Sequence, residues 1–581
     1  MKIKSNILFI CVFSLLVCHV SATEKGAKTL NKFEPTSLFT DASCSRLKDK
    51  VTLKKIKACA FSFYKELALS MYNKQYNSNY RIASYKAYEH PDVQAKQLKT
   101  GTYSLLDNPT GISVAEGDTL LVLVANVHNQ KISLRIHNWD VPGKDGFSVK
   151  SDYPLKSGEN QIVTKNSGLV YIMYHTPDFR TVAPIKIHFA KGGKINGYFD
   201  VTKNSREQWK TMIKAATDKH YDVLGHYAHL IFPVENLAKC NGQDLIDFYD
   251  RLVYEEQRFM GLEKYGKMRN NRMLFNVMYK SFMYSAPYHT AYNVKTMTDL
   301  CNVRSLLISS WGPAHEVGHS NQTRPGLKWI GTTETTNNIQ SMYIQRLFGS
   351  ASRLQMLNKY ERAMNTVFRT CIHHHFIKDH FEKLIPFWQL ELYMEYILGN
   401  TDFYKDIYEH IRIHENKSSE GESLLEFTYI CCKYSGLDLT DFFVKWGFLV
   451  PINQEVKEYG AVKMLSITEQ QIINTKKRIA ALNLPKPKHC LEYICESNES
   501  LYLKNETVVR GNAVREGNMF MMRGWENAVA YEIYDMENNL LFVSPSSSFR
   551  IDCKLPDTFK MYAIAVDGKR TEVFLRRPID A

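Results

Sequence analysis

The spacing of apolar residues changes several times along this 581-residue chain, so no single secondary-structure type can account for all of it. The stretch "LKKIKACAFSFYKELALSMYN" has helical spacing, whereas "TGISVAEGDTLLVLVANV" alternates as a strand does. Helical spacing returns in "GQDLIDFYDRLVYEEQRFMGL", and short alternating strands follow in "NAVAYEIYD" and "FKMYAIAVDG". Because the chain also exceeds what one hydrophobic core supports, we expect several domains.

These patterns predict a multidomain α+β protein. A central, mainly helical domain is flanked by an N-terminal β-sandwich and a small C-terminal β domain. The two prolines of "LNLPKPKH" exclude a continuing helix and mark a linker before the last block. The predicted boundaries are a signal peptide at 1–22, a helical segment at 23–85, the β-sandwich at 86–200, the central domain at 201–465, the linker at 466–489 and the C-terminal β domain at 490–581.

The N-terminal stretch "MKIKSNILFICVFSLLVCHVSATEKG" has the features of a signal peptide. Two lysines precede an apolar run, and Val20 and Ala22 suit a cut near Thr23. The run is too short for a comfortable membrane span, and no other apolar stretch is long enough to cross a bilayer. An alternative keeps Cys18 as a lipid-modified cysteine. We therefore expect a secreted or cell-surface protein without a transmembrane span.

The composition is that of an ordinary folded protein, with 44% hydrophobic and 23% charged residues. The net charge of +14 suits contact with acidic glycans or an anionic surface, or marks a lysine-rich solvated surface. Neither a dense Lys/Arg block nor a nucleic-acid motif is present, so we expect no nucleic-acid partner and a monomer. Cys490 and Cys495 are close enough in sequence to pair across a turn, but the cysteine spacing does not indicate a disulfide-dense scaffold.

The stretch "WGPAHEVGHSNQ" carries the strongest chemical signal. On a helix His315 and His319 lie on one face, so both imidazoles can bind one ion, for which zinc is well suited. Glu316 can take a proton from a metal-bound water at neutral pH. Pro313 is tolerated in the first turn of such a helix. The alternative without a metal site is a pair of surface histidines on a structural helix.

A catalytic zinc ion usually has three protein ligands and one open position. The sequence "RPG" breaks the first helix, and a second helical run starts near "TTETTNNIQSMYIQ". Glu334 lies in the first turn of that run, and a helix–turn–helix return can bring it to the metal. We therefore predict one zinc ion per chain, bound by His315, His319 and Glu334.

Other polar residues near the motif are candidates for supporting or substrate-binding roles. Gln322 supports the site through a hydrogen bond or is a surface residue, while Asn337 and Asn338 orient Glu334 or meet the substrate. The donor for an oxyanion stays open among Tyr288, His289 and Tyr292. The histidines of "CIHHHFIKDH" cannot all face one side of a helix, so we expect them in the core or on the surface: His373, His374, His375 and His380.

The string "WGPAHEVGHSNQ" with "TTETTNNI" resembles the enhancin-like, mucin-degrading zinc metallopeptidases, family sixty of the metallopeptidases. "FWQLELYMEY", "LDLTDFFVKWGFL" and "NPTGISVAEGDTL" are similar to further family segments, so the resemblance spans roughly 80–460. It implies a gluzincin-type fold with His315, His319 and Glu334 as ligands and Glu316 as general base. Val317 and the pair Ser320-Asn321 depart from the common family residues, but neither change removes a ligand.

The function that follows is that of a secreted zinc endopeptidase acting on O-glycosylated, mucin-type proteins, with glycan binding by the β domains. One alternative is a glycan-binding surface protein or adhesin with an inactive peptidase-like domain. Another is a metallopeptidase that cuts unglycosylated proteins.

Overall fold

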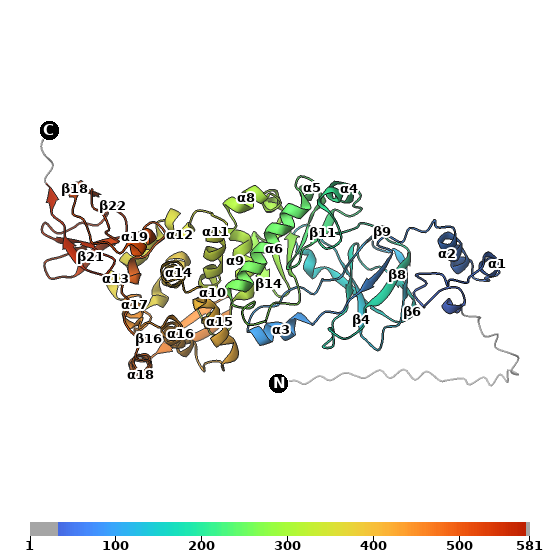
Figure 1. Ribbon diagram of the computed structural model, residues 1–581, viewed down its shortest axis with the longest axis horizontal. Helices are drawn as coiled ribbons and strands as arrows, with labels where there is room; N and C mark the ends of the chain where they lie inside the picture. The colour runs from blue at the N-terminus through green and yellow to red at the C-terminus, as the bar shows by residue number, and fades with distance from the viewer. Residues whose placement is uncertain (1–32, 577–581) are drawn as a thin grey trace, which may run out of the picture. The chain divides into compact units, whose positions relative to one another are not determined.

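The computed structural model describes residues 33–576, which form two compact units that divide between Tyr76 and Asn77 (Figure 1). The expected signal peptide and Cys18 lie outside the described residues. No helix within the described part is long and apolar enough to span a membrane. The first unit contains the helices α1 (Leu53–Lys57) and α2 (Ser62–Tyr72).

The second unit begins with two antiparallel sheets, in the orders β1-β8-β3-β6 and β5-β4-β7-β2-β9. Side chains from both sheets, such as Val122 and Ile172, form one buried core, which fits the predicted sandwich. Strand β1 lies in the segment that was expected to be helical. That prediction was wrong there because "IASY" is too short to show a period of its own. The strands are β1 (Ile82–Tyr85), β2 (Pro109–Val114), β3 (Thr119–Val124), β4 (Ile132–His137), β5 (Lys150–Leu155), β6 (Gly158–Val163), β7 (Gly168–Met173), β8 (Ile185–Lys191) and β9 (Lys194–Ile195).

A mixed sheet in the order β10-β11-β12-β13-β15-β14 follows, in a region whose pattern predicted mainly helices. Strands β12 and β13 are buried at every residue. Strands covered on both faces do not alternate between apolar and polar residues, so their sequences resemble those of buried helices. The bounds are β10 (Phe199–Asp200), β11 (His220–Leu224), β12 (Ala228–Pro233), β13 (Met273–Met278), β14 (Met283–Ala286) and β15 (His289–Asn293).

Helices pack on this sheet, and one of them, α9, carries His315, Glu316 and His319 (Figure 1). Helix α6 packs on β11, β12 and α9, while α9 also packs on β14 and α11. The helices are α3 (Pro91–Leu98), α4 (Trp209–Lys214), α5 (Val234–Leu237), α6 (Gly242–Phe259), α7 (Met297–Leu300), α8 (Val303–Ile308), α9 (Trp311–Asn321), α10 (Thr333–Thr336), α11 (Asn338–Leu347), α12 (Arg353–Met356), α13 (Lys359–Thr370), α14 (His380–Glu391), α15 (Phe403–Ile413), α16 (Glu420–Ser435) and α17 (Thr440–Lys445).

A hairpin of β16 (Ile452–Glu458) and β17 (Ala461–Ile467) leads into helix α18 (Glu469–Ala480). This helix occupies much of the predicted linker, which the sequence analysis treated as irregular. A capping box between Thr468 and Gln471 starts the helix, and its buried residues Ile472 and Ile479 pack into the main core. The two prolines follow the helix and do not interrupt it.

The C-terminal region contains helix α19 (Glu499–Lys504) and two four-stranded sheets, in the orders β22-β19-β18-β25 and β21-β20-β23-β24. Cys490 and Cys495 precede these sheets as free thiols, so the suggested pairing across a turn is absent in the described chain. The strands are β18 (Asn512–Glu516), β19 (Met519–Arg523), β20 (Ala530–Tyr534), β21 (Leu540–Ser544), β22 (Ser548–Arg550), β23 (Lys560–Ile564), β24 (Arg570–Glu572) and β25 (Leu575–Arg576).

Gly318 lets helix α9 approach helix α11, and its replacement by Ala tests this contact. A Cβ at Gly318 would lie 2.5 Å from the carbonyl oxygen of Asn337, which is backbone and cannot move freely. We expect Gly318→Ala to lower the free energy of unfolding by about 1–3 kcal/mol, as overpacked cores do. The matched control is Gly312→Ala in the same helix, where the nearest atoms belong to the flexible end of Met283. Urea unfolding should show the loss in Gly318→Ala alone; equal midpoints for the two variants would contradict it.

Candidate metal centre

Helix α9 places His315 and His319 side by side, as their spacing predicts. Their Nε2 atoms are 3.1 Å apart, and their side chains are 19% and 13% exposed. The opposite face of the helix is anchored by the buried residues Ala314 and Val317. The two imidazoles are therefore held by a packed helix and reach solvent at only one side.

Glu334 completes the group from helix α10, 15 residues further along the chain. Its Oε2 lies 3.1 Å from Nε2 of His315 and 3.3 Å from Nε2 of His319. These three residues form the one cluster of at least three potential metal ligands in the described part of the chain. The structure thus brings together the three side chains that the sequence analysis selected.

The geometry of this triangle fits a tetrahedral zinc site. Zinc binds imidazole nitrogen and carboxylate oxygen at about 2.0–2.1 Å, which places neighbouring ligand atoms of a tetrahedron about 3.3 Å apart. The separations of 3.1, 3.1 and 3.3 Å are close to that value. Two nitrogens and one oxygen also form a donor set that suits zinc. The residues present therefore fit one zinc ion.

Neighbouring polar side chains fix the orientation of each imidazole. Oδ1 of Asn338 lies 2.7 Å from Nδ1 of His315, and Oε1 of Gln322 lies 3.4 Å from Nδ1 of His319. An amide oxygen only accepts hydrogen bonds, so each Nδ1 carries the proton in these contacts. The lone pair of each Nε2 is then available to a metal. Gln322 in turn donates to the carbonyl oxygen of Thr333 and to Oγ1 of Thr336, both at 2.9 Å.

Asn337 and Asn338 occupy different positions, although they are adjacent in sequence. The amide nitrogen of Asn337 lies 3.1 Å from Nδ1 of His315 and 3.2 Å from Nε2 of His319. Asn338 donates to the carbonyl oxygen of Glu334 at 2.8 Å. Neither residue lines the cleft beside the three ligands, so both support the site from within the protein.

Glu316 is buried, with 3% of its surface exposed, but it lines the same cleft as the three ligands. Burial raises the pKa of its carboxyl group to about 7, while the backbone of Ser285 in strand β14 donates a hydrogen bond that opposes this rise. Burial also acts to raise the pKa of Glu334, but the nearby imidazoles of His315 and His319 prevail and lower it strongly. The raised pKa of Glu316 allows its carboxyl group to accept and release a proton near neutral pH.

Tyr459, which no sequence motif indicated, lies at the turn between β16 and β17. Its hydroxyl group donates a hydrogen bond to Oε1 of Glu334, although 125 residues separate the two. The neighbouring Glu458 accepts from the backbone N–H groups of Gly331 and Thr333, which ties this hairpin to the start of helix α10. The alternation on both sides of "EYG" could have indicated a hairpin, but no sequence signal places its tip at the metal centre.

Of the three oxyanion candidates from the sequence, Tyr288 lines the cleft of the metal centre, and His289 and Tyr292 do not. The hydroxyl group of Tyr288 donates to Asp92 at 2.9 Å, and Nε2 of His289 lies 2.9 Å from a carboxylate oxygen of Asp145. Tyr292 is fully buried in the core. The histidine-rich stretch is also structural, because His374 is buried and its Nε2 bonds the carbonyl oxygen of Lys383.

The metal centre opens into a cleft of about 960 Å³. Residues of β14 line one part of it, and Tyr459, Glu458 and Lys463 from the hairpin line another. Burial beside Arg324 lowers the pKa of Lys328, also in the lining, to about 8. A cleft of this size accepts a peptide segment and presents it with both positive and negative groups.

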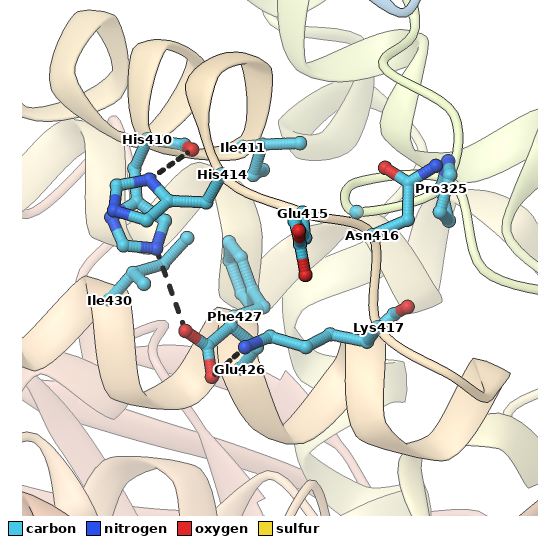
Figure 2. A pocket seen from close by; sticks show the side chains of 12 residues that line it. Pro325, His410, Ile411, His414, Glu415, Asn416, Lys417, Glu426, Phe427 and Ile430 are labelled. Carbon is cyan, nitrogen blue, oxygen red and sulfur yellow. Dashed lines mark hydrogen bonds and ion pairs between the residues drawn. The ribbon is translucent and has the colours of Figure 1, made fainter.

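A much smaller cavity, of about 30 Å³, lies between the end of α15 and the start of α16 (Figure 2). Glu426 reaches into it and pairs with His410 and Lys417, at 3.5 and 3.3 Å. Its apolar wall includes Ile411 and Ile430. A space of this size holds about one water molecule, so it is no candidate for a substrate site.

The comparisons with known proteins point in the same direction as the geometry. Residues 193–447 match the family described as peptidase M60, enhancin and enhancin-like, and residues 89–188 match the N-terminal domain of M60-like peptidases. Together these two matches cover more than half of the chain.

Solved structures and curated proteins add further similarities. A metallopeptidase from Bacteroides thetaiotaomicron is 26% identical with a TM-score of 0.77, over 94% of this chain and 100% of that one. A metallopeptidase in complex with Tn antigen is 26% identical with a TM-score of 0.71, over 86% of this chain and 100% of that one. TRPM8 channel-associated factor 2 of Mus musculus is 23% identical over 62% of this chain; the chain spans 38% of the length of that relative.

The matched segments, the fold and the HExxH helix agree, and the chain belongs to the enhancin and enhancin-like peptidase family M60.

Proposed function

We propose that this protein is an exported zinc-dependent endopeptidase that hydrolyses peptide bonds in O-glycosylated, mucin-type proteins. The observation that carries the proposal is the convergence of His315, His319 and Glu334 within 3.3 Å of one another, with Glu316 lining the same cleft. The membership of family M60 supports a peptidase, and the donor set suits zinc.

The residues around the site divide the chemistry among them. A bound zinc ion would polarise the scissile carbonyl group and make a water molecule more acidic. Glu316, which lines the same cleft as the three ligands, takes the proton from the attacking water and then delivers it to the leaving amine. Asn338 and Gln322 keep the imidazoles in the tautomer that binds a metal through Nε2.

Strand β14 offers a place for the peptide substrate. It ends the six-stranded sheet of the described chain, and residues Met283 to Ala286 line the cleft beside Glu316. On its outer side the backbone N–H and C=O groups can pair with an extended chain, as in other cases of strand addition. A substrate bound in this way runs past the metal centre with its peptide bonds in a regular register.

Tyr459 is our candidate for the group that stabilises the oxyanion. Its phenol already lies at hydrogen-bond distance from Glu334, and the hairpin that carries it forms one wall of the cleft. Burial and the hydrogen bond to Glu334 raise the pKa of this phenol, so it keeps its proton and can donate. Donors aimed at a developing negative charge contribute strongly to acyl-transfer catalysis.

One observation favours a glycosylated substrate over an unglycosylated one. The metallopeptidase solved with Tn antigen aligns over 86% of this chain. The alternative is an adhesin with an inactive peptidase-like domain. It gives no role to Glu316, because an adhesin needs no acidic group that is only 3% exposed.

Glu316→Gln separates metal binding from catalysis. We expect this variant to keep one zinc ion per chain, because Glu316 is no ligand, and to lose peptidase activity by at least about 1000-fold, because an amide cannot accept the proton. Mass spectrometry of the peptides released from a defined O-glycopeptide, with zinc content measured in parallel, checks both expectations. The same peptide without its glycan should remain intact.

Cleavage at the same rate by the wild-type protein and Glu316→Gln would contradict the proposed base. Cleavage of the unglycosylated peptide at the rate of the glycopeptide would contradict the substrate class and leave the peptidase proposal standing. The adhesin alternative predicts no cleavage by either form.

Tyr459→Phe tests the proposed oxyanion donor. The change removes one hydroxyl group from an exposed hairpin, so the fold and the zinc content should stay the same. We expect kcat to fall by about 10- to 100-fold with little change in KM, because the donor acts mainly in the transition state. Steady-state kinetics on the O-glycopeptide measure both parameters. A rise in KM at unchanged kcat would assign Tyr459 to substrate binding instead.

A further inference from the structure

A second large cavity lies between the β-sandwich and the central sheet, away from the metal centre. It has a volume of about 820 Å³ and shares no lining residue with the catalytic cleft. Strands β1 and β10 and the residue Arg272, just before β13, contribute to its walls. The β-sandwich and the central sheet belong to the same compact unit.

Tyrosine is the dominant aromatic residue of this cavity. Four tyrosines line it, namely Tyr80, Tyr85, Tyr88 and Tyr198. The rings of Tyr80 and Tyr198 meet edge to face, with centroids 5.4 Å apart, and the hydroxyl group of Tyr80 donates to the carbonyl oxygen of Tyr198 at 3.2 Å. These two half-buried rings therefore present fixed surfaces to a ligand.

The conformation of Tyr80 is strained. Its φ is +57°, a region that residues with aromatic side chains rarely adopt. Gly111 accommodates the ring, because a Cβ at that glycine would lie 2.5 Å from it. Such outliers persist where the surrounding structure holds them, and they gather at binding sites. The protein thus keeps this ring in place at a cost in backbone strain.

Tyr85 supplies a polar group that the protein itself does not satisfy. The residue is 5% exposed and lines the cavity, yet its hydroxyl group has no hydrogen-bond partner among the described residues. Burial raises the pKa of this phenol strongly, so it stays protonated. Buried hydroxyl groups without a partner cost free energy, and each calls for an explanation.

Charged and amide groups complete the cavity. Arg272 is fixed by a 2.6 Å hydrogen bond from Nε to the carbonyl oxygen of Gly225 and by its contact with Asp107. Nζ of Lys86 lies 4.7 Å from the centroid of the Tyr88 ring. Asn108 donates to the carbonyl oxygen of Lys86 at 2.9 Å, which leaves its own oxygen as an acceptor. The cavity therefore offers donors and acceptors beside aromatic faces.

We propose that this cavity is a saccharide-binding site, separate from the catalytic cleft. A sugar ring has a C–H face that packs on tyrosine and hydroxyl groups that both donate and accept, which matches the mixed lining. An apolar ligand would leave the hydroxyl group of Tyr85 without a partner, which is unfavourable. An acidic substituent on the sugar would meet Lys86, because Arg272 already contacts Asp107.

The test is a titration of the full chain with lactose and with 3′-sialyllactose, followed by ligand-observed NMR. Neither sugar contains a peptide bond, so the outcome is independent of the peptidase proposal. Tyr85→Phe removes only the unpartnered hydroxyl group and should not lower the unfolding midpoint. We expect it to weaken binding by about threefold to tenfold, the effect of one hydrogen bond. Tyr198→Ala should weaken binding as well.

The matched control is Tyr221→Phe, which removes another buried hydroxyl group without a partner in the described chain, from a residue outside the lining. It and Glu316→Gln should bind as the wild-type protein does. If the protein prefers 3′-sialyllactose and Lys86→Met abolishes that preference, the acidic group of the sugar lies beside Lys86. If both sugars bind equally, a neutral sugar ring occupies the cavity. Either result supports the site. Absence of binding, or binding that Tyr85→Phe and Tyr198→Ala leave unchanged, would overturn it.

Discussion

The contact between helices α9 and α11 at Gly318 is the constraint on which the metal centre depends. Without a side chain at Gly318, the backbone of Asn337 can lie directly against α9. That approach brings Glu334, three residues earlier, to both imidazoles, and Asn338, one residue later, to Nδ1 of His315. One close contact between backbones therefore positions a candidate ligand and the group that orients another.

The site combines side chains that are close in sequence with others that are distant. The chemistry of the centre could be predicted because its three candidate ligands lie within 20 residues and the two histidines have helical spacing. Tyr459 could not be predicted, because a hairpin formed 125 residues away brings it to Glu334. The roles of Gln322 and Asn338 were left open by the sequence, since only the folded chain shows which nitrogen each amide faces.

The fold was predictable to a similar extent. Strands such as β6 and β19, in the antiparallel sheets near both ends, alternate between buried and less buried residues, and the sequence indicated these sheets. The central sheet was missed because strands such as β13 are buried on both faces and carry no alternation. Helix α18 was missed because nearby prolines suggested a linker, although they follow the helix and leave its hydrogen bonds intact.

The most direct test of the central claim is a crystal structure of the zinc-loaded protein, with anomalous diffraction measured at the zinc edge. We expect one strong anomalous peak about 2.0–2.1 Å from Nε2 of His315, Nε2 of His319 and a carboxylate oxygen of Glu334. A zinc ion bound elsewhere, or bound by the two histidines with Glu334 turned away, would contradict the account.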